Sequence, residues 1–295
     1  MAKETIKTMH ERDISAERTR SRAVGIIAKA FCYAFLIFMA LVVLFPFYWM
    51  ITTAFKTYGE SILFPPTLLP EHPSWDSFLD VGERIEIGHY LKNSLLVSGG
   101  VVLLQALINI PAAYGFARYE FKGKKLMWAL VMLAFMIPTQ ITFVPVYIMF
   151  SKAKLLKTLW PQILPFAANA YGIFLMRQSF MQVPEELIEA ARMDNAGELK
   201  IMTKVVLPMS KSSILTAEMF SFISTWNSYF WPLAMTRSDE VRPLTLAMQR
   251  LQDANQGLQW PILMAANTLV VLPVLILFLL LSRQIMSSFG YRGSK

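Results

Sequence analysis

One polar segment of the sequence, residues 177–211, contains the side chains best placed for specific chemistry, and that chemistry is docking to a partner. Part of it reads VPEELIEAARMDNAGELKIMTKVVLPMS. Pro184 suits the first position of a helix, and the two acids that follow it complement the positive end of the helix dipole. The segment therefore predicts a short amphipathic helix over 184–193.

The exposed pattern of this predicted helix favours a groove rather than solvent. Leu187, Ala190 and Ala191 form a small apolar face beside the acid Glu189. A solvated connector rarely needs such small residues at helical spacing, whereas a helix that inserts into the groove of a partner does. We expect this helix to dock.

The residues after the helix predict a turn and a second helix. Asp194, Asn195 and Gly197 form the turn, because Asn and Gly tolerate left-handed backbone angles. The second helix is expected to begin near Glu198 and to end before Pro208.

Other catalytic chemistry finds little support in the sequence. No G-x-x-x-x-G-K-[ST] phosphate loop occurs in the chain, so it is not expected to hydrolyse ATP by itself. His10, His72 and His89 are scattered and suggest no metal site. Glu218 is the one acid inside an apolar stretch, where an interfacial or inter-subunit hydrogen bond is favoured over catalysis. We expect a chain that is not an enzyme and holds no cofactor of its own.

The elements that must position the docking segment are transmembrane helices. Charged residues are 16% of the chain against about 25% in a typical soluble protein, hydrophobic residues are 55%, and the mean hydropathy is +0.44. These values exclude a soluble domain, a disordered chain and a coiled coil. The expected fold class is an all-α polytopic membrane protein. Its six predicted spans are 26–51, 90–117, 126–150, 159–176, 212–235 and 261–282.

The positive charges predict how these spans are oriented. Most of the 28 Lys and Arg lie on one side when the spans are counted alternately, and basic residues favour the cytoplasm. Both ends are therefore expected inside. The resulting organisation is a cytoplasmic tail (1–25), a first span (26–51), an outer loop (52–89), a core of five helices (90–283) and a second cytoplasmic tail (284–295).

Three lysines on the outer side do not fit this rule. Lys152, Lys154 and Lys157 fall between the third and fourth spans. Two interpretations stay open: the lysines of a short interfacial helix reach the lipid headgroups, or they form an electropositive mouth that attracts an anionic solute.

Polar and helix-breaking residues inside the spans indicate a translocation pathway. Such groups are tolerated at membrane depth where they face protein or a water-filled cavity. The ones concerned are Gln105, Asn109, Pro111, Pro138, Pro145, Pro165, Asn169, Asn227, Asn267 and Pro273.

Two outer loops are long enough to be functional. The first, within 52–89, is punctuated by prolines and is expected to be ordered but irregular. The second runs over about 236–259 and includes Arg237, Arg242 and Pro243. Its residues 244–251 could form a short amphipathic helix.

The docking segment resembles the "EAA" loop of type I ABC importer permeases. The resemblance rests on Glu189-Ala190-Ala191, the turn that follows and Leu207-Pro208. It continues, as in the carbohydrate-uptake branch with its smaller maltose permease, through Asn93-Ser94, Ala112 to Arg118, Phe121 to Lys125, Trp226-Asn227 and Pro243-Leu244-Thr245. One departure is Asn195, where the family usually has Gly.

The resemblance implies the type I permease fold and a set of partners. A cytoplasmic ATPase dimer, which binds ATP and Mg, would receive the helix 184–193 in a surface cleft, with Glu189 paired to a basic residue. A homologous second permease would complete the pathway, and an extracytoplasmic solute-binding protein would dock through Arg237, Arg242 and Pro243. Membrane lipid is expected around the chain, nucleic acid is not, and the location is the bacterial inner membrane. The implied ATPase-coupling residues are Glu189, Ala190, Ala191, Asp194, Asn195, Gly197, Leu207 and Pro208.

The substrate suggested by the resemblance is a carbohydrate. Outer basic residues favour an acidic oligosaccharide such as an alginate fragment, or else glycerol-3-phosphate, and a neutral oligosaccharide stays an alternative. Aromatic residues at the outer end of the fifth span could be an interfacial belt or could stack on sugar rings. Expected path residues are Asn169, Trp226, Asn227 and Tyr229. An ion-driven secondary transporter is the competing hypothesis, although no internal repeat typical of that class is found.

Overall fold

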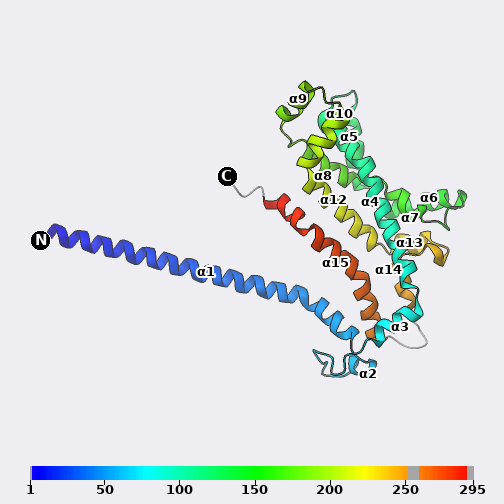
Figure 1. Ribbon diagram of the computed structural model, residues 1–295, viewed down its shortest axis with the longest axis horizontal. Coiled ribbons are helices and arrows are strands. Elements are labelled where there is room, and N and C mark those ends of the chain that lie inside the picture. Colours follow the sequence, from blue (N-terminus) through cyan, green and yellow to red (C-terminus); the bar gives the residue numbers. More distant parts are fainter. Residues whose placement is uncertain (1, 252–258, 291–295) are drawn as a thin grey trace.

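The computed structural model describes residues 2–251 and 259–290, and within these ranges the chain is built from helices and connecting loops. Residues 252–258 of the predicted second outer loop and 291–295 of the predicted tail lie outside the described residues. Figure 1 shows an elongated bundle with the docking segment at one end and the first outer loop at the other.

Three long helices confirm three of the predicted spans as single elements. They are α1 (Ala2–Ala54), α4 (Ile87–Arg118) and α15 (Trp260–Gly290). The portions that are long and apolar enough to cross a membrane are 25–54, 87–118 and 260–284. Helix α1 begins at Ala2, so residues 2–25 of the predicted tail are continuous with the first span. Most of α1 extends away from the bundle (Figure 1).

The other three predicted spans are each broken, which corrects the expectation of continuous helices. The third consists of α5 (Lys124–Met136) and α6 (Thr139–Lys152), which meet at 95°. The fourth consists of α7 (Trp160–Ile163), a 3-10 turn (Leu164–Phe166) and α8 (Ala170–Phe180). The fifth consists of α12 (Lys211–Trp226) and α13 (Phe230–Met235). The total of six spans stays a prediction, because three helices cross by length alone and a fourth span requires the bent pair.

Local chemistry explains where two of these breaks occur. Pro138 has no backbone N–H to donate and forces the preceding Ile137 out of the helical region, to φ −78° and ψ 118°. At the second break, the side chain of Asn169 accepts the free N–H groups at the start of α8. The chain thus ends one helix and begins another inside a predicted span.

Helix α4 organises the interior, because it packs against both α8 and α12. At the end that carries the predicted first outer loop, a hydrophobic cluster joins α3 (Asp76–Arg84), α4, α12 and α15 and includes Val81, Tyr90 and Trp226. At the opposite end, a second cluster joins α4, α8 and the docking segment. Helix α15 packs against α1 and α12.

The first outer loop is ordered, as predicted, but is more regular than expected. It contains α2 (Tyr58–Ser61) and α3. Lys56 donates to the carbonyl of Thr67, and the Glu60 carboxylate accepts hydrogen bonds from the Thr67 hydroxyl (2.8 Å) and the Glu71 N–H (3.0 Å). These contacts fold the proline-rich stretch back onto the end of α1.

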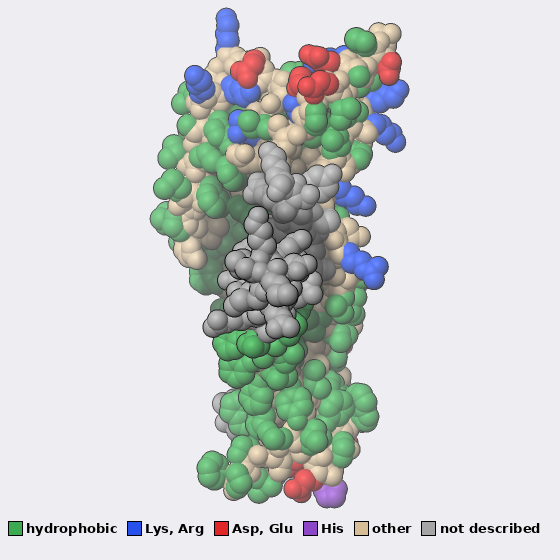
Figure 2. Space-filling view, turned by 90° about the vertical axis from the view of Figure 1, so that its left-hand side faces the viewer, with side chains coloured by type: hydrophobic (Ala, Val, Ile, Leu, Met, Phe, Trp, Pro, Cys, Tyr) green, Lys and Arg blue, Asp and Glu red, His purple; other side chains and the backbone are tan. Residues whose placement is uncertain are grey.

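The surface has the polarity of a membrane protein. Figure 2 shows Lys and Arg side chains gathered at the end that carries the docking segment and a broad apolar surface below them. The crossing portion of α1 has no buried residue in its most apolar window. Lipid or another apolar partner must therefore cover this helix.

Candidate functional site

The docking segment forms two short helices joined by a tight turn. Helix α9 (Glu185–Met193) follows Pro184, and Asp194 ends it. Asn195 has a φ of 54°, which confirms the left-handed position predicted for the turn. Gly197 then precedes α10 (Glu198–Ile201).

The second helix of the segment does not end before Pro208, which corrects the sequence prediction. It continues from α10 through a π-helical turn (Met202–Val206) into α11 (Leu207–Met209), and the break comes at Ser210. Pro208 lies in the first turn of α11, where its missing N–H is tolerated. The wider π turn directly before it accommodates the residue.

Helix α9 presents its predicted docking face outward and is anchored by a residue that sequence reasoning missed. Leu187, Glu189 and Ala190 are exposed, while Ala191 is half-buried. Ile188 is fully buried in the cluster beneath α9. Its place next to the small apolar face was the available signal for this anchor.

A network of charged and polar side chains fixes both ends of α9. Arg118, the last residue of α4, pairs with Glu185 at 2.6 Å. Arg192 lies 3.8 Å from Glu185 and bonds Glu198 at 3.2 Å. The Tyr114 hydroxyl donates to Glu198 at 2.7 Å. Arg192 was not singled out from the sequence. Glu185, Glu198 and the stretch with Tyr114 and Arg118 were, but the contacts of Tyr114 and Arg118 were not predicted, because their partners lie 84 and 67 residues away in the chain.

The network also shifts protonation equilibria at this end of the molecule. The hydrogen bond from the Tyr114 hydroxyl lowers the pKa of Glu198, and Tyr119 and Arg192 contribute in the same direction. The hydrogen bond between Arg192 and Glu198 raises the pKa of Arg192. Glu198 is therefore held as a carboxylate between a phenol and a guanidinium.

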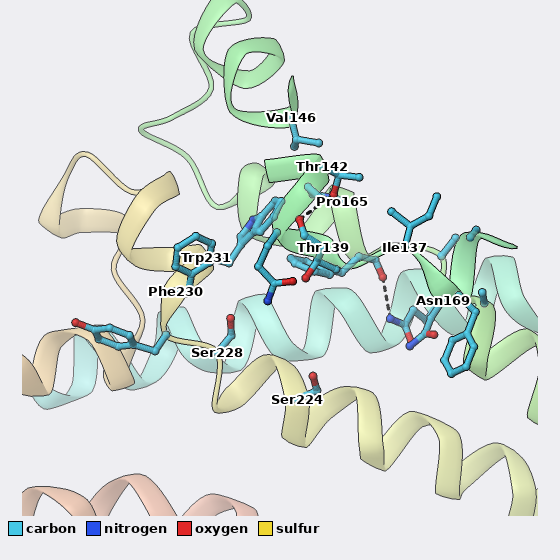
Figure 3. Close-up of a pocket in the computed structure, with 18 residues that line it drawn as sticks. Ile137, Thr139, Thr142, Val146, Pro165, Asn169, Ser224, Ser228, Phe230 and Trp231 are labelled. Atoms are coloured by element: carbon cyan, nitrogen blue, oxygen red, sulfur yellow. Dashed lines mark hydrogen bonds between the residues drawn. The ribbon is translucent and has the colours of Figure 1, made fainter. Parts of the chain in front are cut away.

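A cavity of about 700 Å³ lies where the broken spans meet. Its wall comes from the α5–α6 bend, the start of α8 and the link between α12 and α13, and none of the described side chains that line it is charged. Ser224 and Ser228 point into it from the α12 side, opposite Thr139 and Thr142 (Figure 3). The polar lining is Gln105, Thr139, Gln140, Thr142, Asn169, Ser224 and Ser228, and the rings are Phe135, Phe166, Tyr229, Phe230 and Trp231.

Buried amides hold the cavity wall in place. Gln105 donates to the carbonyl of Phe166 at 2.8 Å and accepts from the Ser221 hydroxyl at 2.6 Å. Asn109 accepts from the backbone N–H of Asn169 at 3.2 Å. Irregular backbone is tolerated at membrane depth only where it is buried in protein or lines a cavity, and these contacts meet that condition.

Two of the four predicted path residues line the cavity. Asn169 and Tyr229 line the cavity. Trp226 is only 1% exposed and donates its indole N–H to the carbonyl of Val270 on α15, so this structure places it in the core. Asn227 ends α12 and does not line the cavity. Gln105, which the sequence analysis named among the polar residues of the spans, also lines the cavity. The lining residues that were missed are Thr139, Gln140, Thr142, Ser224 and Ser228, and their signal was polarity within apolar spans.

The three predicted docking residues of the second outer loop also differ in exposure. Arg237 is exposed and hydrogen-bonds the Tyr147 hydroxyl of α6. Arg242 is half-buried and pairs with Asp239 at 2.8 Å. Pro243 is buried, directly before α14 (Leu244–Ala247). The expected amphipathic helix over 244–251 is α14 followed by a 3-10 turn (Met248–Leu251).

The outer loop is fastened to the outer end of α4. Asn93 donates to the carbonyls of Glu240 (2.8 Å) and Arg242 (2.9 Å), and the Ser94 hydroxyl accepts from the Leu244 N–H (2.8 Å). Asn93 and Ser94 therefore hold the second outer loop against α4.

The remaining charged candidates lie apart from the cavity lining. Lys152, the last residue of α6, and Lys154 and Lys157, which follow it, are exposed. Glu218 is buried in α12, and neither of its carboxylate oxygens has a hydrogen-bond partner in the described part of the chain.

Comparison with known proteins gives this architecture a family. Residues 109–288 match the family described as "Binding-protein-dependent transport system inner membrane component". The chain belongs to this family. It is therefore a subunit of a binding-protein-dependent transport system and a multi-pass protein of the bacterial inner membrane.

Curated relatives cover nearly the whole permease. The sn-glycerol-3-phosphate transport system permease protein UgpE of Yersinia pestis is 30% identical over 86% of this chain and 92% of its own. The diacetylchitobiose uptake system permease protein NgcG of Streptomyces coelicolor is 29% identical over 88% of this chain and 86% of its own.

Solved structures share the fold. A chain from a bacterial ABC transporter involved in the import of the acidic polysaccharide alginate matches with a TM-score of 0.77 and 21% identity, covering 89% of this chain and 96% of that one. A chain from a bacterial alginate ABC transporter in complex with an alginate pentasaccharide-bound periplasmic protein matches with a TM-score of 0.61 and 18% identity, covering 88% and 94%. These matches confirm the predicted type I permease fold.

Proposed function

We propose that the permease forms half of the carbohydrate pathway of an ATP-driven importer. The observation that carries this proposal is the connection between two sites on one set of helices. An exposed helix, α9, lies at one end of α4 and α8, and a polar, ring-lined cavity lies beside the middle of α4 and the start of α8. Movement of the first site can therefore alter the second.

The proposed partners follow from the missing phosphate loop and from the exposed surfaces of this chain. Its sequence contains no phosphate loop, so ATP and Mg are bound by a separate pair of ATPase subunits that receive α9. A homologous second permease covers the open side of the cavity and the bare face of α1. A solute-binding protein docks on the outer loops, with Arg237 as the most accessible of the predicted contacts. Both chain ends lie in the cytoplasm, as the distribution of Lys and Arg indicates.

The cavity supports a sugar as the solute. Aromatic rings stack on the apolar faces of pyranose rings, and amides and hydroxyls exchange hydrogen bonds with sugar hydroxyls. This half of the cavity contributes no counter-charge from its described lining. An acidic oligosaccharide would therefore be attracted by Lys152, Lys154 and Lys157 at the outer side, and its carboxylates would be neutralised by the partner subunit.

A neutral oligosaccharide is the second candidate, because the uncharged lining favours it. The name of the diacetylchitobiose relative describes a neutral solute, and that of the glycerol-3-phosphate relative an anionic one. The amides and hydroxyls of the lining can hydrogen-bond the hydroxyl groups of either solute.

The importer proposal is tested by Glu189→Lys in the complete complex. An acid exposed on the docking face would be replaced by a base that faces the basic residue of the cleft, a change that costs about 2–5 kcal/mol at a buried interface. We expect the ATPase to be lost on purification and ATP-dependent uptake to fall by at least about tenfold. Glu120→Lys, an equal change at an exposed acid in the loop after α4, is the matched control. Uptake by the purified chain alone, driven by a proton gradient, would refute the proposal.

A further inference from the structure

Two arginines at the ends of α4 and α8 bind the carbonyl groups of each other's helix. Arg118, the last residue of α4, donates through Nη2 to the carbonyls of Phe180 and Val183, both at 2.5 Å, where α8 ends. Arg177 of α8 donates through Nε to the carbonyl of Phe116, where α4 ends, at 3.2 Å. The two helices are therefore capped reciprocally.

This arrangement is favourable for helix ends that meet. The last four carbonyls of a helix have no partner within it and carry the negative end of the dipole, so a guanidinium satisfies both needs. Arg118 is largely buried, with 8% of its side chain exposed. A buried guanidinium needs several partners, and here Glu185 supplies the counter-charge while two carbonyls accept from Nη2.

The reciprocal caps made by Arg118 and Arg177 are called the clamp below. Glu185 connects this clamp to the docking helix, because it is the first residue of α9. Arg118 thus contacts three segments at once: α8, α9 and the loop between them. Arg177 stacks on Trp128 of α5 at 4.3 Å from the ring centroid, which adds the first half of the bent pair. Four helices meet at this one cluster.

At the cavity, α4 is also joined to the 3-10 turn (Leu164–Phe166) that precedes α8. Thirteen residues before Arg118 on α4, or about 20 Å along the helix, Gln105 bonds the carbonyl of Phe166 on the wall. Between these levels, Asn109 accepts from the N–H of Asn169, which caps α8. Two helices fixed to one another at both levels move as one body.

We propose that Arg118 is a positioning residue that converts movement of α9 into movement of the cavity wall. The proposal rests on the importer function argued above. The arginine holds α4, α8 and α9 in one rigid lever, and the docked helix drives one end of that lever. Without the clamp, α9 moves under the ATPase while the cavity wall stays behind.

The test is Arg118→Gln in the complete complex, reconstituted in vesicles with its binding protein and the transported sugar. The measured quantity is the number of sugar molecules taken up per ATP hydrolysed, which a general loss of folded protein would leave unchanged. We expect this ratio to fall by about tenfold, within the usual range of coupling between sites. Lys122→Gln removes the same charge from an exposed site near the same helix end and should preserve the ratio.

A charge swap separates the carbonyl caps from the ion pair. Arg118→Glu combined with Glu185→Arg keeps an ion pair but leaves the carbonyls of Phe180 and Val183 without this donor. If the carbonyl caps carry the coupling, the charge-swapped variant should still take up few sugar molecules per ATP hydrolysed. A normal ratio in this variant would overturn the proposal. An unchanged ratio in Arg118→Gln would do the same.

Other outcomes are also decisive. If Arg118→Gln does not assemble, Arg118→Lys retains the charge with fewer directed donors, and it should assemble with a reduced ratio. A normal ratio in that variant, or failure of both variants to assemble, overturns the coupling role. Wild-type vesicles that show no ATP-dependent uptake would instead contradict the importer function itself.

Discussion

Gln105 is the side chain whose removal should disturb the cavity most, because it connects three elements from the centre of α4. It is 3% exposed, and both ends of its amide are used. Gln105→Leu keeps a similar shape but leaves the Phe166 carbonyl and the Ser221 hydroxyl without this partner. We expect the variant to fold less stably and to transport more slowly, since the wall at Phe166 is released.

The size of the effect follows from two stranded polar groups. Each buried group that loses its partner costs about 1–3 kcal/mol in a soluble core, but side-chain hydrogen bonds between membrane helices average about 0.6 kcal/mol. We therefore expect a loss of about 1–4 kcal/mol for the pair. At about 2–4 °C per kcal/mol, the slope for domains of about 150–250 residues, the melting temperature should fall by about 2–16 °C.

Three further variants, melted at the same heating rate as Gln105→Leu, make this measurement decisive. Gln140→Leu is the matched control, because Gln140 also lines the cavity but is exposed. Ser221→Ala and the double variant complete a cycle, in which the double variant should be more stable than the sum of the single losses implies. Equal melting temperatures for Gln105→Leu and Gln140→Leu, or strictly additive losses, would refute the role given to Gln105.

Two further predictions concern charge at the two ends of the permease. Since the pKa of Glu198 is lowered in the folded chain, its contribution to stability is present above the ordinary pKa of glutamate and is lost as the pH falls through the lowered value. Wild type should therefore lose stability in acid by a step that Glu198→Gln lacks, as thermal melts across pH would record, and parallel curves would contradict this. Replacing Lys152, Lys154 and Lys157 by glutamine should slow uptake of an acidic oligosaccharide by about tenfold at low salt and much less at high salt. Uptake of a neutral one should not change, and an unaltered rate for the acidic sugar would remove the electrostatic argument.

The docking segment could be predicted from the sequence because its signals are local. Pro184 marks the start of α9, and Asn195 occupies the left-handed turn that its side chain tolerates. The long spans were predictable for a similar reason, since length and hydropathy are properties of a continuous stretch. What links these elements was not predictable, because Arg118 and Glu185 are 67 residues apart in the chain.

The breaks within spans show a different limit. Proline alone does not predict them, because Pro46, Pro111 and Pro273 lie inside the continuous helices α1, α4 and α15. At Pro138 the same residue separates α5 from α6. Whether a proline bends or breaks a membrane helix depends on whether neighbours satisfy the freed backbone groups, and that is a tertiary property. The same holds for Trp226 and Tyr229, which are three residues apart and lie in the core and on the cavity respectively.

The shortness of α8 gives the breaks a mechanical meaning. This helix has 11 residues and is therefore about 16 Å long. Its first turn is capped by Asn169 at the cavity, and the carbonyl of its last residue, Phe180, is held by Arg118 beside the docking helix. A continuous fourth span would place the cavity wall in the middle of a helix, where it could move only with the whole span. Because α8 begins at the cavity, a tilt imposed at its far end by α9 changes the position of Asn169 directly.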